Sequence, residues 1–211
     1  MNAALVSAPL WLAWSAYVLM AGSPGPSNMA IIHVAMTRGR RDALLFAAGV
    51  LSGTAFWATL AGLGLSHAMA RSAVAMDLLK TLGGLYLVWL ALKSACTAWR
   101  SAPPTETRSI NGSPKRLYLK GMLMHLTNPK AVLAWLSVAA VALPAGAAWS
   151  DTLLVIGSCL LWGAGLFAGY ALVFSSASAR RSYLALRRPV EGLMSVVFGY
   201  AGVRLLCSRM A

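Results

Sequence analysis

Two short polar segments interrupt long apolar runs of this chain, and each of them contains proline. Residues 23–28 read SPGPSN and residues 125–130 read HLTNPK. Proline removes a backbone hydrogen-bond donor, and it disfavours helical geometry in the residue before it. Each segment is therefore expected to open a helix and to leave backbone groups available to a bound molecule. The candidate binding residues are Pro24, Gly25, Pro26, Ser27, Asn28, Thr127, Asn128, Pro129 and Lys130.

The two sides of such a break offer opposite charges to a ligand. The helix that starts after the break presents free N–H groups and the positive end of its dipole, which suit a carboxylate. Pro26 and Pro129 fit the first turn of such helices. The helix that ends before the break presents free carbonyl groups, near residues 21–22 and 126–127, which suit an ammonium group. A zwitterionic amino acid carries both groups, so it is the ligand that the breaks indicate.

Lys130 and His125 are the candidates for proton coupling. A charge at membrane depth costs about 2.5–3.5 kcal/mol on insertion scales, so Lys130 is expected to face the interior of the protein. There it could pair with a substrate carboxylate, change its protonation during transport, or cap interior carbonyl groups. Histidine is the side chain that titrates nearest to neutral pH. His125 could carry a proton or be a hydrogen-bonded packing residue, and the sequence leaves both interpretations open.

The composition indicates that membrane helices hold these residues. The chain has 211 residues, of which 59% are hydrophobic and only 11% are charged, whereas soluble domains carry about 25% charged residues. Its apolar runs are close to the roughly 20 residues that span a bilayer. They lack the period-two alternation of barrel strands, so helices must satisfy the backbone. Six spans are expected, at about residues 9–36, 43–66, 78–99, 121–143, 152–176 and 189–208.

Residues 101–116 divide the chain into two halves. This segment is rich in proline, glycine and polar residues, so it is expected to be a cytoplasmic linker. The half-repeats 1–100 and 117–211 then hold three spans each, and because three is odd the halves have opposite orientation, as in the inverted repeats of many transporters. The predicted fold is an all-α polytopic membrane protein, a single transmembrane transporter domain over residues 1–211. It has six transmembrane helices as two inverted three-helix repeats, with helices 1 and 4 broken.

The basic residues predict the orientation in the membrane. Twelve of them lie in or next to the first, third and fifth connections, which share one side, whereas the opposite side has few. The positive-inside rule places this side in the cytoplasm, so both termini are expected outside. No Lys or Arg precedes the first apolar run, which indicates a retained helix rather than a cleaved signal peptide. The twelve are Arg38, Arg40, Arg41, Arg100, Arg108, Lys115, Arg116, Lys120, Arg180, Arg181, Arg187 and Arg188.

Other classes of protein fit the sequence less well. The net charge of +13 lies mostly between apolar runs, so nucleic acid is not expected as a partner. Cys96, Cys159 and Cys207 are far apart, which argues against a disulfide framework, a metal site or an electron conduit, and no cofactor is expected. An enzyme is not expected either, because no mid-span acid could orient a Ser–His pair. A cation exporter would need several intramembrane carboxylates or thiolates, which are sparse here.

The broken segments resemble the LysE/RhtB family of amino-acid exporters. The similarity rests on the PGP motif followed by Asn28, a basic loop at residues 37–41 (TRGRR), the HLTNPK segment, and residues 79–87 (LKTLGGLYL) in the third span. It covers essentially the whole chain and indicates the branch that resembles threonine, homoserine and homoserine-lactone efflux proteins. The resemblance implies secondary export of an amino acid or derivative across the bacterial inner membrane, driven by the proton motive force. The partners would be a small-molecule substrate and the lipid bilayer, and a homodimer stays open.

The chain departs from the family pattern near the breaks. Ser27 stands between the PGP motif and Asn28, His125 stands where the family often has Asn, and Thr54 stands where an acidic residue is common in the second span. No carboxylate lies in the middle of any expected span, which disfavours a cationic substrate such as lysine. A neutral or hydroxylated amino acid, similar to threonine or homoserine, is therefore the expected substrate. The alternative is an exporter of a cation or of another small solute on the same broken-helix scaffold.

Overall fold

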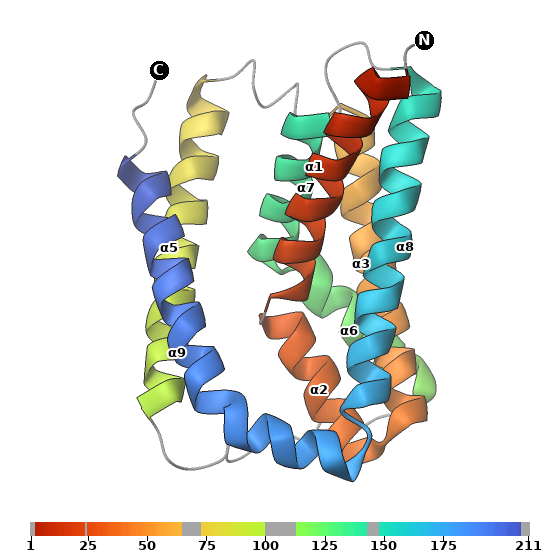
Figure 1. Cartoon of the computed structure of the whole chain (residues 1–211), viewed down its shortest axis with the longest axis vertical. Coiled ribbons are helices and arrows are strands. Elements are labelled where there is room, and N and C mark those ends of the chain that lie inside the picture. The colour runs from red at the N-terminus through yellow and green to blue at the C-terminus, as the bar shows by residue number, and fades with distance from the viewer. Residues whose placement is uncertain (1–2, 24, 65–72, 100–112, 143–147, 208–211) are drawn as a thin grey trace. The chain divides into compact units, whose positions relative to one another are not determined.

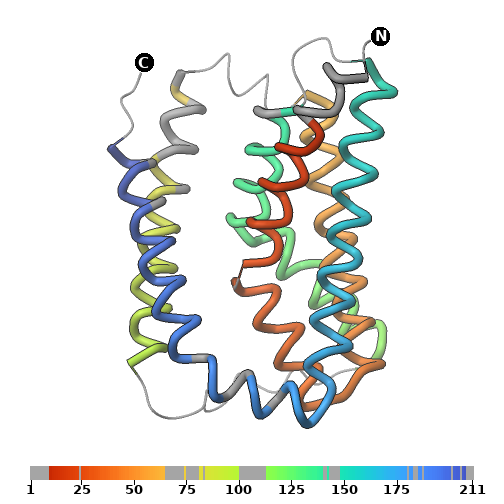
Figure 2. Tube along the Cα trace, in the orientation of Figure 1, coloured from red at the N-terminus to blue at the C-terminus, as the bar shows by residue number. Residues whose placement is uncertain are grey.

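All regular secondary structure in the described residues is helical (Figure 1). The computed structural model describes residues 3–23, 25–64, 73–99, 113–142 and 148–207, and Figure 2 traces the backbone. The all-helical class predicted from the sequence is confirmed in this part of the chain. The helices are α1 (Ala3–Gly22), α2 (Pro26–Arg38), α3 (Arg40–Gly62), α5 (Ala73–Trp99), α6 (Pro114–Leu126), α7 (Pro129–Ala142), α8 (Trp149–Val173) and α9 (Ala177–Cys207).

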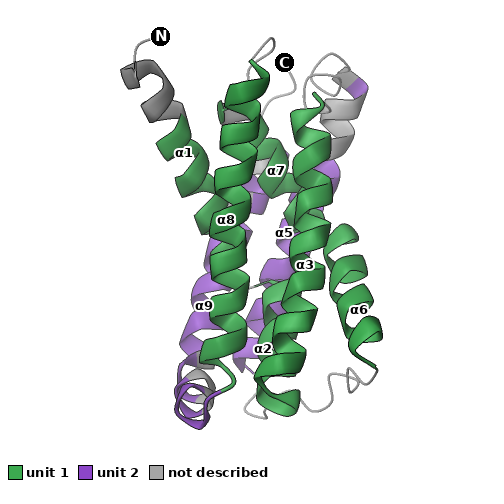
Figure 3. Ribbon diagram, turned by 90° about the vertical axis from the view of Figure 1, so that its right-hand side faces the viewer, with its two compact units in different colours: residues 1–68, 110–175 green, residues 69–109, 176–211 purple. Residues whose placement is uncertain are grey.

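The chain folds into two compact units (Figure 3). The first comprises residues 1–68 and 110–175 and contains α1, α2, α3, α6, α7 and α8. The second comprises residues 69–109 and 176–211 and contains α5 and α9. Each unit therefore takes helices from both of the predicted halves, because helices far apart in the sequence pack against one another within it.

Both predicted interruptions are present in the first unit. α1 ends at Gly22 and α2 begins at Pro26, while α6 ends at Leu126 and α7 begins at Pro129. Each proline occupies the first helical turn, where a missing N–H costs no helical hydrogen bond. Gly25 precedes α2 in an extended conformation, with φ −170° and ψ 174°. Each broken helix thus presents the end of one segment and the start of the next at the same place.

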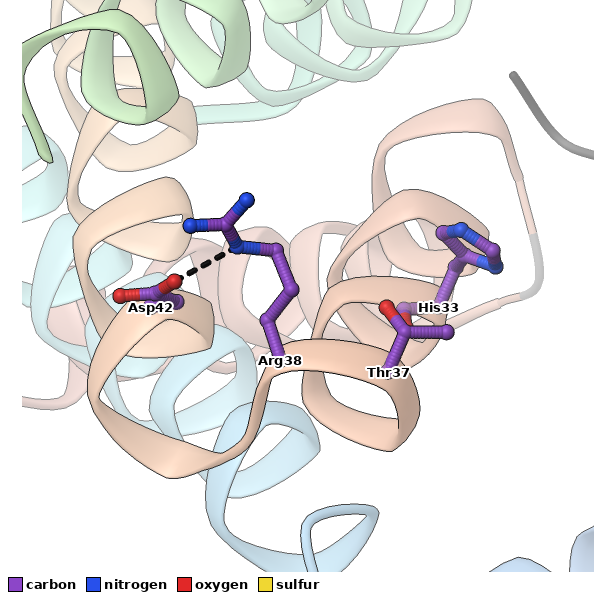
Figure 4. A network of polar contacts seen from close by, with 4 residues as sticks. All are labelled: His33, Thr37, Arg38 and Asp42. Atoms are coloured by element: carbon purple, nitrogen blue, oxygen red, sulfur yellow. Dashed lines mark hydrogen bonds and ion pairs between the residues drawn. The ribbon is translucent and has the colours of Figure 1, made fainter. Parts of the chain in front are cut away.

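A sharp corner joins α2 to α3 at Gly39. This glycine has φ +83°, a left-handed conformation that residues with a side chain rarely adopt. Across the corner, Arg38 Nε donates to Asp42 Oδ2 at 2.6 Å (Figure 4). Asp42 lies in the first turn of α3, where a carboxylate also favours the positive helix end. The Thr37 hydroxyl donates to the His33 carbonyl at 2.7 Å and so stays within α2. The glycine and the ion pair together stabilise the turn.

Glycine lets α3 and α6 approach to backbone contact. A methyl group built on Gly49 would collide with the carbonyl oxygen of Tyr118. A methyl group on Gly53 would lie 2.9 Å from Cβ of His125. Small residues allow this kind of close approach between membrane helices. The contact holds His125 against α3, next to the break between α6 and α7.

Two apolar clusters hold the first unit together. One includes residues of α1, α3, α7 and α8 and contains Tyr17, Trp135 and Cys159. The other lies among α2, α3 and α8 and contains Phe46 and Phe167. Cys159 is fully buried and acts as a small packing residue. Tyr17, Trp135 and Phe167 also form part of the wall of the site described below.

Two described helices, α3 and α8, are long and apolar enough to cross a membrane. They have 23 and 25 residues, which gives lengths of about 35 and 38 Å. Both exceed the roughly 30 Å of a bilayer's hydrocarbon core. The shorter stretches Leu10–Gly22 and Pro129–Ala139 are also apolar. Large apolar side chains are exposed along α8, among them Leu153, Leu161 and Trp162, and they are suited to contact with lipid.

Two helix starts differ most from the sequence predictions. α6 begins at Pro114, inside the predicted linker 101–116, because proline suits the first helical turn. α9 begins at Ala177, so the basic residues 180–188, predicted to lie in a loop, are helical. Arg, Leu and Ala are good helix formers, and they dominate this stretch. α9 has Pro189 in its interior and bends along its course (Figure 1).

The second unit is a pair of helices in close contact. Gly84 of α5 and Gly202 of α9 face each other, and a methyl group on Gly202 would lie 3.0 Å from the Gly84 carbonyl oxygen. Arg188 Nε donates to the Ala98 carbonyl at 3.1 Å. These glycines act as packing residues, because small residues let membrane helices approach closely. The rest of the predicted linker, residues 101–112, lies outside the described residues.

Candidate substrate site

A hollow lies in the first unit at the point where both broken helices open. Its cavity volume in this conformation is about 30 Å³, which is room for a water molecule and is below the roughly 300–1,000 Å³ of small-molecule sites. Tyr17 and Trp135 form part of its wall, with ring centroids 5.2 Å apart. Its polar lining includes six buried side chains, which come from α2, α3, α6, α7 and the break before α7. They are Ser27, Asn28, Thr54, His125, Asn128 and Lys130.

The carbonyl groups at the end of α1 accept hydrogen bonds from three other helices. We call the carbonyls of residues 21–23 the α1 carbonyl cluster. Asn28 Nδ2 donates to the Ala21 carbonyl at 2.7 Å and to the Ser23 carbonyl at 3.0 Å. The Tyr170 hydroxyl donates to the Gly22 carbonyl at 2.6 Å. Lys130 Nζ donates to the Ser23 carbonyl, also at 2.6 Å. The sequence predicts free carbonyls here, and that prediction is wrong for this conformation. The protein's own donors fill them, because an unsatisfied carbonyl in a membrane interior is costly.

The two helices that begin at the breaks are capped differently. Asn128 precedes α7, and its Oδ1 accepts the backbone N–H of Lys130 at 3.1 Å. Its Nδ2 donates to Ser27 Oγ at 3.2 Å, which joins the start of α7 to α2. At α2, by contrast, the N-cap Gly25 provides no side-chain cap. The first turn of α2 therefore offers N–H groups and a positive dipole end to an anion in the hollow.

His125 bridges two helices through both of its ring nitrogens. Nδ1 lies 3.0 Å from Ser27 Oγ, and Nε2 lies 2.8 Å from Thr54 Oγ1. A neutral imidazole donates through one nitrogen and accepts through the other, while a hydroxyl can take either role. The ring also makes an edge contact with Phe167, with centroids 5.9 Å apart. The arrangement favours a role in positioning the two hydroxyls in the wall of the hollow.

Lys130 is the one charged side chain among the described lining residues. It is only 6% exposed. Its Nζ binds the Ser23 carbonyl and lies beside Gly25, where a methyl group would be 3.0 Å away. Because the extended backbone at Gly25 suits any residue, the lysine and not the backbone accounts for the absence of a side chain there. Of the three roles open to Lys130 from the sequence, this conformation displays the capping of interior carbonyl groups.

Tyr17 adds a hydroxyl that makes no hydrogen bond of good geometry among the described residues, although Thr54 lies near it. Its side chain is only 1% exposed and lines the hollow. A buried hydroxyl without a partner costs about 1–3 kcal/mol. Such a group in the wall of a hollow is suited to bind a ligand oxygen or a water molecule.

Most of the predicted site residues meet at the hollow. Thr127 does not, because it is exposed and its hydroxyl donates to the Leu123 carbonyl of its own helix at 2.9 Å. Pro26 and Pro129 begin their helices without lining the hollow. Pro24 lies outside the described residues. The predicted residues that do line the hollow are Gly25, Ser27, Asn28, His125, Asn128 and Lys130.

Three contributing residues are missed as site residues by sequence reasoning. Tyr17 and Tyr170 carry no motif, since isolated tyrosines are common in apolar helices. Thr54 had a signal, because it follows Gly53 of the close α3–α6 contact and stands at a departure from the family pattern. In the described part of the chain, no group of three or more His, Cys, Asp or Glu side chains could hold a metal ion.

The fold and the site together define a helical membrane protein with a small polar hollow at two broken helices, and broken helices form the binding sites of many secondary transporters. Residues 18–209 match the family model described as LysE type translocator. The chain belongs to the LysE type translocator family.

Curated relatives cover most of the chain. The threonine efflux protein of Escherichia coli (strain K12) is 30% identical over 195 residues, which cover 89% of this chain and 92% of the relative. The threonine efflux protein of Salmonella typhi is 31% identical over 198 residues, with the same coverage. The homoserine/homoserine lactone efflux protein of Salmonella typhi is 30% identical over 126 residues, 57% of this chain and 59% of the relative. No solved structure matches the chain.

Proposed function

We propose that this protein exports a small amino acid or a derivative across the bacterial inner membrane. The observation that carries the proposal is the hollow at the break between α1 and α2, which is lined both by Ala21 of the carbonyl cluster and by Gly25, the N-cap of the next helix, which has no side-chain cap. Such opposed helix ends suit the ammonium and carboxylate groups of an amino acid. Membership of the LysE family and similarity to proteins named for threonine and homoserine efflux support it. We assign these residues a binding role rather than a catalytic one, since no acid orients the Ser27–His125 pair among the described lining residues.

The charge of the hollow favours a neutral or hydroxylated substrate. Lys130 is a cation, and no carboxylate accompanies it among the described lining residues. A second cation on the substrate side chain would be buried without a counter-charge, which is strongly unfavourable. The hydroxyl groups of Ser27, Thr54 and Tyr17 can instead bind a substrate hydroxyl. A threonine- or homoserine-like molecule carries such a hydroxyl.

We extend the proposal to topology and energy coupling. Six spans in two inverted repeats would place the basic connections in the cytoplasm and both termini in the periplasm. The α2–α3 corner and the start of α6 lie at the same end of the first unit (Figures 1 and 3), which supports a shared side for these connections. Export would be driven by the proton motive force, with Lys130 and His125 as the residues that couple it.

Counterflow in proteoliposomes tests the function. Vesicles containing the purified chain are loaded with unlabelled threonine and diluted into labelled threonine, and we expect the label to accumulate transiently inside them. Vesicles loaded with homoserine instead of threonine should accumulate the label as well. Ser27→Ala, in the hollow, should weaken exchange. Ser137→Ala, a matched change at an exposed serine bonded to its own helix, should not. Exchange of lysine without threonine or homoserine would contradict the substrate class, and exchange of no amino acid would contradict the function.

A further inference from the structure

Lys130 lies between the two ends of the first broken helix. Its Nζ donates a hydrogen bond to the Ser23 carbonyl, 2.6 Å away, just after the end of α1. The same atom lies beside Gly25, the N-cap of α2, where an added methyl group would be 3.0 Å from it. The ammonium group therefore contacts the negative end of one helix and lies next to the positive end of the other.

These two helix ends act on a cation in opposite ways. The α1 carbonyl cluster attracts it, and the start of α2, which has no side-chain cap at Gly25, repels it. A zwitterion would satisfy both ends, with its ammonium group at the carbonyl cluster and its carboxylate at α2. Lys130 supplies only the first of these two charges.

The side chain of Lys130 ends in the same chemical group as the α-ammonium of an amino acid, which is the group that carbonyls bind. Each is a primary ammonium with three N–H donors. The cluster has two other donors: Asn28 has a short side chain, and Tyr170 has a rigid side chain. The four-carbon stem of lysine is flexible, so its ammonium group can leave the cluster without movement of α7.

We propose that the α1 carbonyl cluster is a subsite for a primary ammonium group, and that Lys130 is its resident occupant, which the ammonium group of the substrate displaces. The proposal rests on the proposed function for the nature of the transported molecule. On displacement, the Lys130 ammonium turns to the carboxylate of the same substrate, bound at the start of α2. After the substrate leaves, Lys130 returns to the Ser23 carbonyl. The empty transporter then changes conformation with its buried carbonyls satisfied.

In a competing mechanism, Lys130 stays bound to the Ser23 carbonyl throughout transport and attracts only the substrate carboxylate. The two accounts differ in what happens when the lysine ammonium is removed. Under displacement, Lys130→Met opens the carbonyl cluster to an external amine. Under the fixed-lysine account, the cluster is not a ligand site, and the variant gains no affinity for amines.

The test measures binding of 1-amino-2-propanol, the threonine skeleton without its carboxylate, to the full chain in lipid nanodiscs by titration calorimetry. We expect Lys130→Met to bind this amine at least tenfold more tightly than the wild type. (2-Hydroxypropyl)trimethylammonium has the same skeleton but no N–H donors, so its affinity should not rise. Lys93→Met is the matched control, because it removes an exposed lysine that lies over Trp89 in the second unit. It should bind both compounds as the wild type does.

Two results would overturn the proposal: no gain in amine affinity in Lys130→Met, or an equal gain for the trimethylated compound, which would indicate a cavity that accepts any cation. If the methionine variant does not fold, Lys130→Gln retains a neutral donor for Ser23, and it should show a smaller gain in the same direction. Failure of the proposed function is separable. A wild-type chain without threonine counterflow, combined with the amine gain, would reject amino-acid export and retain the ammonium subsite.

Discussion

Replacing Tyr17 with phenylalanine should lower the affinity for substrate without lowering the stability of the protein. The change removes the hydroxyl of a lining residue, and this hydroxyl makes no hydrogen bond of good geometry among the described residues. It retains the aromatic ring that packs on Trp135 at 5.2 Å. Because a buried hydroxyl without a partner costs about 1–3 kcal/mol, its removal should leave the free energy of unfolding unchanged or raise it by about 1 kcal/mol.

Substrate affinity should fall in the same variant. A neutral hydrogen bond contributes about 0.5–1.5 kcal/mol, which corresponds to a loss of about two- to tenfold in affinity. Counterflow at a range of concentrations gives this loss, and thermal unfolding in detergent gives the stability. A loss for threonine but not for alanine would mean that Tyr17 binds the side-chain hydroxyl. An equal loss for both would mean that it binds the carboxylate.

Tyr170→Phe is the matched control, since it removes the same atom from a satisfied position. The Tyr170 hydroxyl donates to the Gly22 carbonyl at 2.6 Å, so this variant leaves a partly buried acceptor without this donor and should be less stable by about 1 kcal/mol. The reasoning is refuted if Tyr17→Phe is destabilised as much as Tyr170→Phe, or if it exchanges every substrate as the wild type does.

Three further predictions concern the supports of the hollow, two of them with a matched control substitution. Gly53→Ala should lower the melting temperature, with a cost of about 1–3 kcal/mol, since the new methyl group lies 2.9 Å from His125 Cβ. Gly157→Ala is the control, because a methyl group there meets nothing within 4 Å. It should gain up to about 1 kcal/mol of stability from helix propensity. An equal loss of stability in the Gly53 and Gly157 variants would contradict the close α3–α6 contact. Thr54→Val leaves His125 Nε2 without its hydroxyl partner and should reduce stability and counterflow, whereas Thr54→Ser should retain both. Identical behaviour of the two variants would mean that the bond between Thr54 and His125 contributes to neither. Asn128→Ala removes the cap of α7 and should cost about 0.5–2 kcal/mol in thermal unfolding, and an unchanged melting temperature would argue against that cap.

The features that follow from local chemistry could be predicted from the sequence. Proline forces a break wherever it stands, so the helix starts at Pro26 and Pro129 follow from the covalent structure of those residues. A lysine inside an apolar run must avoid lipid, so the burial of Lys130 follows from the cost of its charge. Gly49 and Gly53 indicate close packing of α3 against some other helix, and the structure shows that this helix is α6.

The features that depend on the rotation of one helix against another could not be predicted. Tyr170 reaches Gly22 across 148 positions of sequence, and Thr54 reaches His125 across 71. No pattern in a single sequence indicates which face of α8 or α3 points to the break. The expectation of free carbonyls failed for the same reason, because the donors that fill them come from other helices.

Photolabelling tests the central claim most directly. A neutral amino acid that carries a diazirine is irradiated with the full chain in membranes, and the labelled peptides are identified by mass spectrometry. We predict label in peptides that contain Tyr17, Asn28 or Trp135, which line the hollow, and we predict that excess threonine suppresses it. Label confined to α5 and α9, or label in the hollow that excess threonine and homoserine leave unchanged, would contradict a substrate site at the two broken helices.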